Sequence, residues 1–279
     1  MLNLDNSPQT RRNFVGASDA PAIMGVSPWK TAYQLWEEKV GIRESNFTSK
    51  AMQRGIDMEE EARMSFEEQT GIFVFPQRIV NEHHSWMVAT LDGMDLKGEN
   101  VVEIKCPGKI DHTCAMDGVI PEKYIPQLMH QMIVACVTSI YYFSYSPSSS
   151  KILQLEYDPA YSKVLLDKEI QFWNNVQEFT PPTLSDKDYN LKEDELWNQA
   201  AQEWLHINSQ LDSLKKKEEE LRNTLVAMSG KSNSMGCGIK ISRILRKGNV
   251  EYKNIPELKD VDLDKYRKGP IEIWRIGKC

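Results

Sequence analysis

Apolar residues recur at helical spacing in four segments that lie before residue 180. In each segment they fall three or four positions apart, which creates one apolar face, and a glycine or proline marks one end. We therefore expect helices over residues 31–40, 50–69, 126–137 and 159–179. Thr31 is placed to cap the first helix, and Gly41 and Gly71 follow the first and the second.

Between these helices the apolar period changes to that of β-strands. Residues 73–80, 86–96 and 101–106 are rich in Val, Ile, Thr and aromatic residues, with Asp92-Gly93 and residues 98–100 as turn formers. They predict a meander of three strands, and residues 140–145 and 152–157 predict two more. The order of elements predicts an α/β fold, a mixed central sheet flanked by helices, of the restriction-endonuclease-like kind. Its core is expected to hold the tryptophans Trp29, Trp36 and Trp86.

The chain after residue 179 has a different pattern. Residues 180–190 are polar and proline-containing, which predicts a linker after a core of residues 1–179. Residues 191–230 predict a long helix with a heptad seam, in which Glu218 takes one a position. The remaining a and d residues are Trp197, Trp204, Leu211 and Leu225, and Ala200, Ile207, Leu214, Leu221 and Met228. The helix can pair with a partner helix or pack on the core. Residues 231–279 alternate like a small β unit, with Ile271, Ile273, Trp274 and Ile276 as its last apolar positions.

Charge is divided unevenly along the chain. The whole sequence has 34 Lys and Arg against 40 Asp and Glu, a net charge of -6. Residues 231–279 hold 12 basic and 6 acidic residues and so carry +6, which leaves -12 for the rest. An acidic body does not exclude a nucleic-acid enzyme, because clustered carboxylates can hold a metal cation that reverses the local field.

Composition excludes several classes of protein. The sequence has no apolar run near the length of about 20 residues that a membrane span needs, and it starts with a polar segment, so we expect a cytoplasmic protein. Five cysteines without a C-x-x-C pair argue against a disulfide framework, a zinc ribbon and an iron–sulfur cluster. His83, His84 and His112 lack metal-ligand spacing and are expected on the surface or in loops.

Two carboxylates and a lysine carry the strongest chemical signal. Asp92 lies in one predicted strand, and Glu103 and Lys105 lie two positions apart in the next, so alternation puts the last two on one face. Such oxygen ligands suit Mg²⁺, with Mn²⁺ as a substitute, and the lysine can orient or deprotonate a water or stabilise charge on phosphorus. The bland alternative is a solvated hairpin with a surface ion pair.

Six ordered segments give this pair of strands a context. Together they resemble the YqaJ-type phage recombinases, relatives of phage lambda exonuclease in the PD-(D/E)xK nuclease superfamily, over residues 10 to 178. The segments are GASD (16–19), IMGVSPWKT (23–31), LWEEK (35–39), RGIDMEEEA (54–62), EIKCP (103–107) and YIPQLMHQ (124–131). A series of motifs in order is far more specific than any one of them.

The resemblance assigns roles to single residues. It implies that Glu59, Asp92, Glu103 and the carbonyl of Ile104 bind the metal and that Lys105 is catalytic. Gln127 matches the first residue of a Q-x-x-x-Y motif that supports the site, although Gln131 stands where the tyrosine is expected.

Arg11 and Ser18 match the family's contacts to the terminal 5′-phosphate. Because Arg12 is adjacent to Arg11, either arginine can be the one that matches. Ser18 can equally cap a helix that begins at Asp19.

The implied function is metal-dependent resection of linear double-stranded DNA, 5′ to 3′. Mononucleotides would be released, and a 3′ strand would remain for a single-strand annealing protein. The family also implies a homo-oligomer, with a ring trimer as one form, encoded by a phage or prophage of a bacterial host. Two alternatives stay open: an endonuclease of the same superfamily, and a non-catalytic module that binds DNA ends and recruits other proteins.

Overall fold

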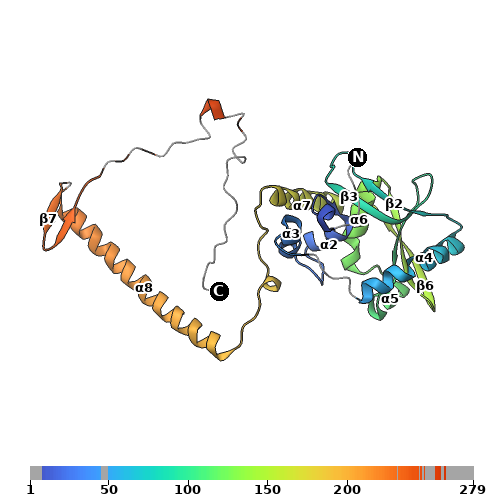
Figure 1. Cartoon of the computed structure of the whole chain (residues 1–279), viewed down its shortest axis with the longest axis horizontal. Helices are drawn as coiled ribbons and strands as arrows, with labels where there is room; N and C mark the ends of the chain where they lie inside the picture. Colours follow the sequence, from blue (N-terminus) through green and yellow to red (C-terminus); the bar gives the residue numbers. More distant parts are fainter. Residues whose placement is uncertain are drawn as a thin grey trace. The chain divides into compact units, whose positions relative to one another are not determined.

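The computed structural model describes residues 8–44, 50–230, 232–244, 246, 248, 255–258 and 261. The chain divides into two units, Met1–Asn190 and Leu191–Cys279 (Figure 1). The elements of the first unit are α1 (Pro8–Arg11), β1 (Val15–Gly16), η1 (Ala17–Asp19), α2 (Ala20–Ile23), α3 (Ala32–Val40), α4 (Lys50–Thr70), β2 (Phe75–Val80), β3 (Met87–Met94), β4 (Val101–Lys105), α5 (Lys109–Met116), η2 (Glu122–Tyr124), α6 (Ile125–Ala135), β5 (Ser139–Ser146), β6 (Ser149–Glu156), α7 (Pro159–Gln177) and η3 (Asp186–Asp188). In the described part of the chain, no helix has both the length and the apolar composition needed to cross a membrane.

The central sheet of the first unit is mixed. Strands β2, β3 and β4 form the predicted antiparallel meander, and β5 pairs parallel with β4 and antiparallel with β6. β2 follows one edge of β3 along most of its length. β1 and β4 therefore share the other edge, where β1 pairs at Met87 and Val88 and β4 pairs at Gly93 and Met94.

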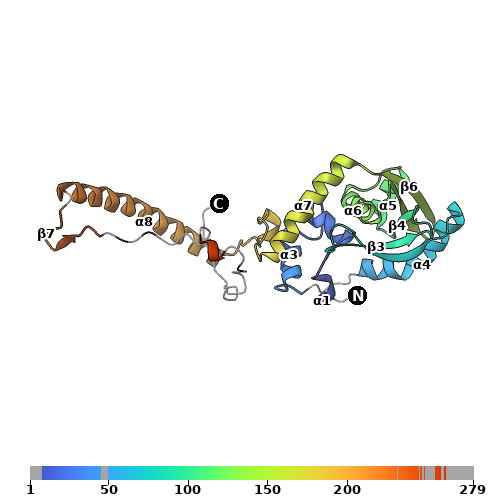
Figure 2. The ribbon, with the colours of Figure 1, turned by 90° about the horizontal axis from the view of Figure 1, so that it is seen from above.

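Helices cover both faces of this sheet, as Figure 2 shows. On one face, Ala62 and Phe66 of α4 pack with strand residues such as Val102 and Phe143. On the other, Leu128 and Met132 of α6 and Leu165 of α7 pack with the opposite face of β3 and β5. Burial of these apolar side chains on both faces stabilises the sheet and confirms the predicted α/β class.

Local sequence signals explain the ends of the predicted helices. The Thr31 side chain accepts a hydrogen bond from the Gln34 N–H and caps α3. Gly41 ends the same helix with φ 82°, a left-handed conformation that glycine adopts without steric cost. Helix α4 runs to Thr70 and is followed by Gly71, which also has a positive φ.

Two local predictions are wrong. Asp92-Gly93 is not a turn, because both residues lie inside β3. A Cβ at Gly93 would lie 2.5 Å from Val74 Cγ2 and 2.8 Å from Val102 Cγ1, so this glycine permits close packing. Ser18 lies within η1 and caps no helix, because Gly16 holds the N-cap position.

Two more residues lie elsewhere than expected. His112 is in α5, a helix of eight residues that the sequence pattern did not predict, and its ring nitrogens contact serine hydroxyls. Trp29 is 67% exposed, whereas Trp36 is buried as expected.

The second unit contains α8 (Glu195–Met228), β7 (Ser234–Gly236), β8 (Ile239–Ile241) and η5 (Pro256–Leu258). The Asp194 side chain caps α8 by accepting from the Trp197 N–H. All of its residues are at least partly exposed, including the heptad positions Leu221 and Met228. The predicted apolar positions from Ile271 to Ile276 lie outside the described residues.

A buried ion pair joins α6, α7 and β3. His130 Nδ1 lies 2.8 Å from Glu169 Oε1, and His130 Nε2 lies 3.1 Å from the Val88 carbonyl oxygen. Because both partners are acceptors, both ring nitrogens donate, which is the hydrogen-bonding pattern of an imidazolium. Burial works to lower the pKa of His130, but the Glu169 charge, with the Val88 carbonyl and Asp19, outweighs it and raises this pKa.

We expect this pair to make stability depend on pH. The pKa of His130 is higher in the folded chain than in the unfolded chain, where it is about 6.5. Its contribution is therefore complete below about pH 6.5 and is lost as pH rises through the folded pKa. Urea unfolding of the wild type and of a His130→Phe/Glu169→Leu double variant measures the difference. The stability of the wild type relative to the variant should fall as pH rises above about 6.5, and a pH-independent difference would contradict the assignment.

Candidate active site

The candidate site lies where β3 and β4 separate. The two strands pair at Gly93↔Val102 and Met94↔Val101 and then diverge, and β1 rejoins the same edge of β3 at Val88. The backbone of β3 between these pairings is open to side chains. Gln131 Nε2 donates to the Thr90 carbonyl at 3.4 Å, and Arg63 Nε donates to the Asp92 carbonyl at 3.1 Å.

Asp92 bridges the two diverging strands. Its Oδ2 accepts a hydrogen bond from the Ile104 N–H at 2.8 Å, across the gap from β3 to β4. In a strand, the N–H and C=O of one residue point to the same side. The Ile104 carbonyl therefore faces the same gap as the Asp92 carboxylate.

Glu103 is the buried centre of the site. It is 2% exposed, and three side chains donate to its carboxylate: Lys105 and Gln127 to Oε1 and Gln131 to Oε2. A buried carboxylate needs such partners, because its desolvation is otherwise too costly. Lys105 comes from the same strand and face, and both glutamines come from α6.

Lys105 also faces an aromatic ring. Its Nζ lies 5.5 Å from the ring centre of Tyr124, whose hydroxyl donates to Asp111 Oδ2 at 3.1 Å. Burial works to lower the pKa of Lys105, but the charges of Glu103 and Asp92 outweigh it, so this pKa is raised.

Glu59 is connected to the site through Arg63. Its Oε1 accepts from the Arg63 guanidinium at 2.9 Å, and this same guanidinium donates to the Asp92 carbonyl. The charge of Glu59 also contributes to the raised pKa of Asp92. The structure thus brings Glu59 near Asp92 but pairs it with Arg63, a residue that the motifs did not single out.

The acidic groups fit a hard divalent cation. Burial first, and the nearby Glu103 charge second, raise the pKa of Asp92 well above its ordinary range. Two carboxylates and a carbonyl oxygen in one gap form an oxygen donor set, and Mg²⁺ typically binds through one or two carboxylates plus waters and a phosphate. Across the described residues, no three His, Cys, Asp or Glu side chains are gathered as a metal group. The fit therefore rests on Asp92, Glu103 and the Ile104 carbonyl.

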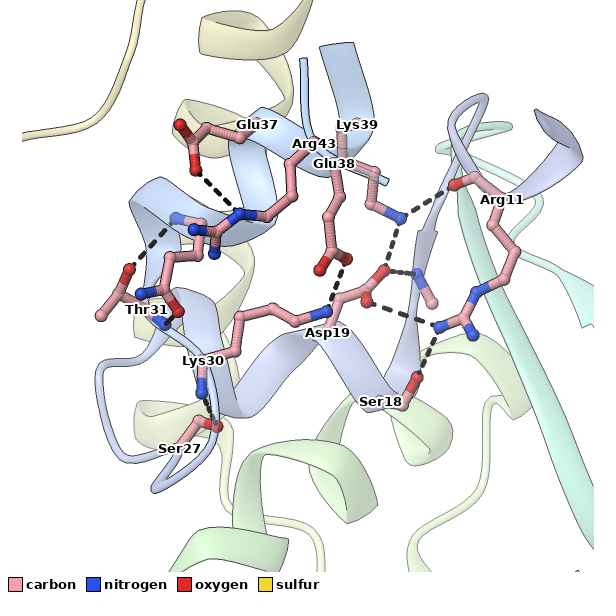
Figure 3. A network of polar contacts seen from close by, with 12 residues as sticks. Arg11, Ser18, Asp19, Ser27, Lys30, Thr31, Glu37, Glu38, Lys39 and Arg43 are labelled. Carbon is pink, nitrogen blue, oxygen red and sulfur yellow. Dashed lines mark hydrogen bonds and ion pairs between the residues drawn. The ribbon is translucent and has the colours of Figure 1, made fainter. Parts of the chain in front are cut away.

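The two predicted phosphate contacts lie together at a separate cluster. Arg11 Nη2 donates to Ser18 Oγ at 3.3 Å, and both side chains are exposed (Figure 3). Behind them, the buried Asp19 accepts from Lys39 Nζ at 2.6 Å and from the Gly16 N–H at 3.0 Å. Burial works to raise the pKa of Asp19, but the charges of Lys39 and Arg11 lower it overall.

Lys39 holds the backbone that carries Arg11. Its ammonium also donates to the carbonyl oxygens of Arg11 at 2.9 Å and Phe14 at 2.7 Å. Arg12, the neighbouring candidate, lies on another side, where a Cβ at Gly41 would come within 2.9 Å of its Nη1. The geometry therefore pairs Ser18 with Arg11.

Part of this chain matches a known protein family. Residues 8–138 match the YqaJ-like viral recombinase domain. This segment is a YqaJ-like viral recombinase domain. The protein YqaJ of Bacillus subtilis (strain 168) is 25% identical over 238 residues, which span 77% of this chain and 75% of that protein.

Solved structures resemble the YqaJ-like domain in fold. The alkaline exonuclease LHK-Exo from Laribacter hongkongensis matches with a TM-score of 0.54 and 22% identity, over 61% of this chain and 91% of that one. The same exonuclease in complex with dAMP matches with a TM-score of 0.55 and 22% identity, over 62% and 92%. This likeness shows that the two proteins share a fold.

Gln131 is, after Arg63, a second site residue that the sequence motifs did not identify. It stands where the superfamily motif has tyrosine, yet its amide contacts Glu103 as Gln127 does. The signal was present, because residues four apart on a helix share a face. Two glutamines on one face of α6 can therefore both reach one carboxylate.

We expect Gln131→Leu to destabilise the fold. The change leaves Glu103 Oε2 without this donor, and hydrogen bonds to charged groups contribute about 1.5–3 kcal/mol. Urea unfolding at neutral pH measures the loss.

The matched control is Gln154→Leu, because the Gln154 amide donates to Ser139 Oγ at an exposed position. Its effect should stay within about 0.5 kcal/mol. Equal effects of the two changes would show that the contact with Glu103 contributes nothing special.

Proposed function

We propose that this chain is a metal-dependent exodeoxyribonuclease that resects linear double-stranded DNA 5′ to 3′. The observation that carries the proposal is the meeting of Asp92, Glu103 and Lys105 where β3 and β4 separate. The matched domain and the shared fold with an alkaline exonuclease support it.

The carboxylates and the Ile104 carbonyl would hold Mg²⁺, or Mn²⁺ in its place. The bound cation supplies a Lewis acid that polarises the phosphoryl oxygen. Glu103 holds Lys105 at the gap, and Gln127 and Gln131 fix the orientation of Glu103. Lys105 then presents a positive charge to a phosphate in the gap, where negative charge develops during hydrolysis.

Arg11 and Ser18 are proposed to bind the terminal 5′-phosphate. A guanidinium and a hydroxyl are donors that match phosphate oxygens, and Asp19 and Lys39 hold them in place from behind. Binding of the 5′ end would determine the position at which the DNA strand is cut. Release of mononucleotides is consistent with the capture of dAMP by LHK-Exo.

The product would be a 3′ single strand, the substrate of a single-strand annealing protein. The long helix α8 presents its heptad residues at least partly exposed in the described part of the chain. We assign this second unit to assembly with copies of the chain or with the annealing protein, because every residue proposed for chemistry lies in the first unit.

We expect Asp92→Asn and Glu103→Gln to abolish metal-dependent cleavage. Each change removes a hard anionic ligand but keeps the side-chain volume, and cleavage is measured at a temperature at which circular dichroism shows each variant to be folded. Digestion of end-labelled linear duplex, with Mg²⁺ and with EDTA, should show cleavage reduced by about 100-fold or more.

Glu60→Gln is the control, since Glu60 is exposed on the same helix as Glu59. It should cleave like the wild type. Near-normal cleavage by either Asp92→Asn or Glu103→Gln would refute the metal site.

We expect Arg11→Ala to lose the preference for phosphorylated 5′ ends. The guanidinium is the charged partner of the phosphate, so the variant should cut phosphate and hydroxyl ends at similar rates. Initial rates on the two substrates are the measurement, with closed circular duplex as the uncut reference.

Arg43→Ala is the matched control, because Arg43 is a nearby exposed arginine that pairs with Glu37 (Figure 3). It should keep the preference. If Arg11→Ala keeps it and Arg12→Ala loses it, the phosphate contact belongs to Arg12.

A further inference from the structure

Trp29 is held on an ordered loop with its ring exposed. The N–H groups of Trp29 and Lys30 both donate to Ser27 Oγ at 3.2 Å, and the N–H of the buried Ser27 donates to the Pro21 carbonyl. Trp29 is nevertheless 67% exposed, although tryptophan is on average a well buried residue. The loop thus presents a large aromatic face to solvent instead of burying it.

Lysine side chains lie over one face of the Trp29 ring and in the pocket beside it. Lys123 Nζ lies over one face of the Trp29 ring, 4.9 Å from its centre, and a pocket beside the ring is lined by Lys30, Lys187 and Gln34. Lys123 is paired with Asp111 and Lys30 with Glu38, so much of their charge is compensated. The ring face, more than the net charge, is the distinctive feature of the pocket.

The same lysine connects Trp29 with the candidate active site. Lys123 Nζ lies 5.3 Å from the Tyr124 ring centre, and Lys105 Nζ lies 5.5 Å from that centre. These separations bound the distance from the Trp29 ring to the Lys105 ammonium at about 16 Å. A DNA strand rises about 3.4 Å per nucleotide, so the ring lies within about five nucleotides of a phosphate at Lys105.

We propose that Trp29 is a stacking platform for an unpaired nucleobase of the DNA substrate. An aromatic face flanked by cations is the arrangement by which proteins bind single-stranded nucleic acid without reading its sequence. The inference rests on the proposed function, because it takes DNA as the substrate of the neighbouring site. Lys123 and Lys187 would lie near the phosphates of the DNA strand, and the base would stack on the indole ring of Trp29.

The test uses the full chain in EDTA, so that binding is measured without cleavage. Fluorescence anisotropy compares a labelled oligo-dT strand with an abasic strand of equal length, for Trp29→Ala, Trp29→Phe and the wild type. We expect Trp29→Ala to weaken oligo-dT binding about tenfold and to leave abasic binding unchanged, while Trp29→Phe retains most of the affinity. The matched control is Phe73→Ala, which removes another exposed aromatic ring of the first unit and should bind like the wild type.

Two outcomes would overturn the proposal. Unchanged oligo-dT binding by Trp29→Ala would show that the ring does not stack on DNA bases and would favour another role, such as contact with a protein. An equal loss of affinity for the oligo-dT and the abasic strand would show that the substitution acts through the loop conformation or the phosphate contacts and not through base stacking. Wild-type cleavage with Mg²⁺ is measured separately, so a chain that stacks bases without cutting DNA refutes the nuclease and keeps the platform.

Discussion

The buried negative charge of Glu103 is the constraint on which the rest of the site depends. A carboxylate at 2% exposure is stable only where donors replace the water that it loses. Lys105 supplies one donor from the same strand, but Gln127 and Gln131 come from α6, on a separate segment of chain. The position of α6 over the sheet is therefore part of the site. The buried contacts of His130 with Glu169 and with the Val88 carbonyl fix that position.

Much of this arrangement is legible in the sequence, because it depends on short-range rules. Strand alternation puts Glu103 and Lys105 on one face, and the caps at Thr31 and Gly41 follow from local hydrogen bonding and backbone sterics. Asp92-Gly93 shows where such rules fail. The pair has the composition of a turn, but the close approach of Val74 and Val102 makes glycine a packing requirement inside a strand. Contacts of that kind join residues that are far apart in the sequence, so no local sequence pattern predicts them.

The exposure of Trp29 and the contact of Gln131 with Glu103 escape sequence-based prediction for a related reason. Average burial predicts a core tryptophan, yet the hydrogen bonds of Ser27 turn this part of the loop so that the ring faces solvent. The family motif has tyrosine at the position of Gln131, so the motif does not predict a role for a glutamine there. Helical spacing nevertheless puts Gln131 on the same face of α6 as Gln127. In both cases the residue departs from the common pattern, and its surroundings decide what it does.

One strand fixes the offset between the two polar clusters. β1 leads into the turn that carries Ser18 and pairs with β3 at Val88, and Asp92 lies four residues further along β3. At about 3.3 Å per residue, the backbone separation between these two points is about 13 Å. Because a strand held on its other edge by β2 cannot easily change length, the distance from phosphate contact to carboxylates is set by the sheet and not by loops. In the proposed function, cleavage at a constant distance from the 5′ end follows from that rigidity.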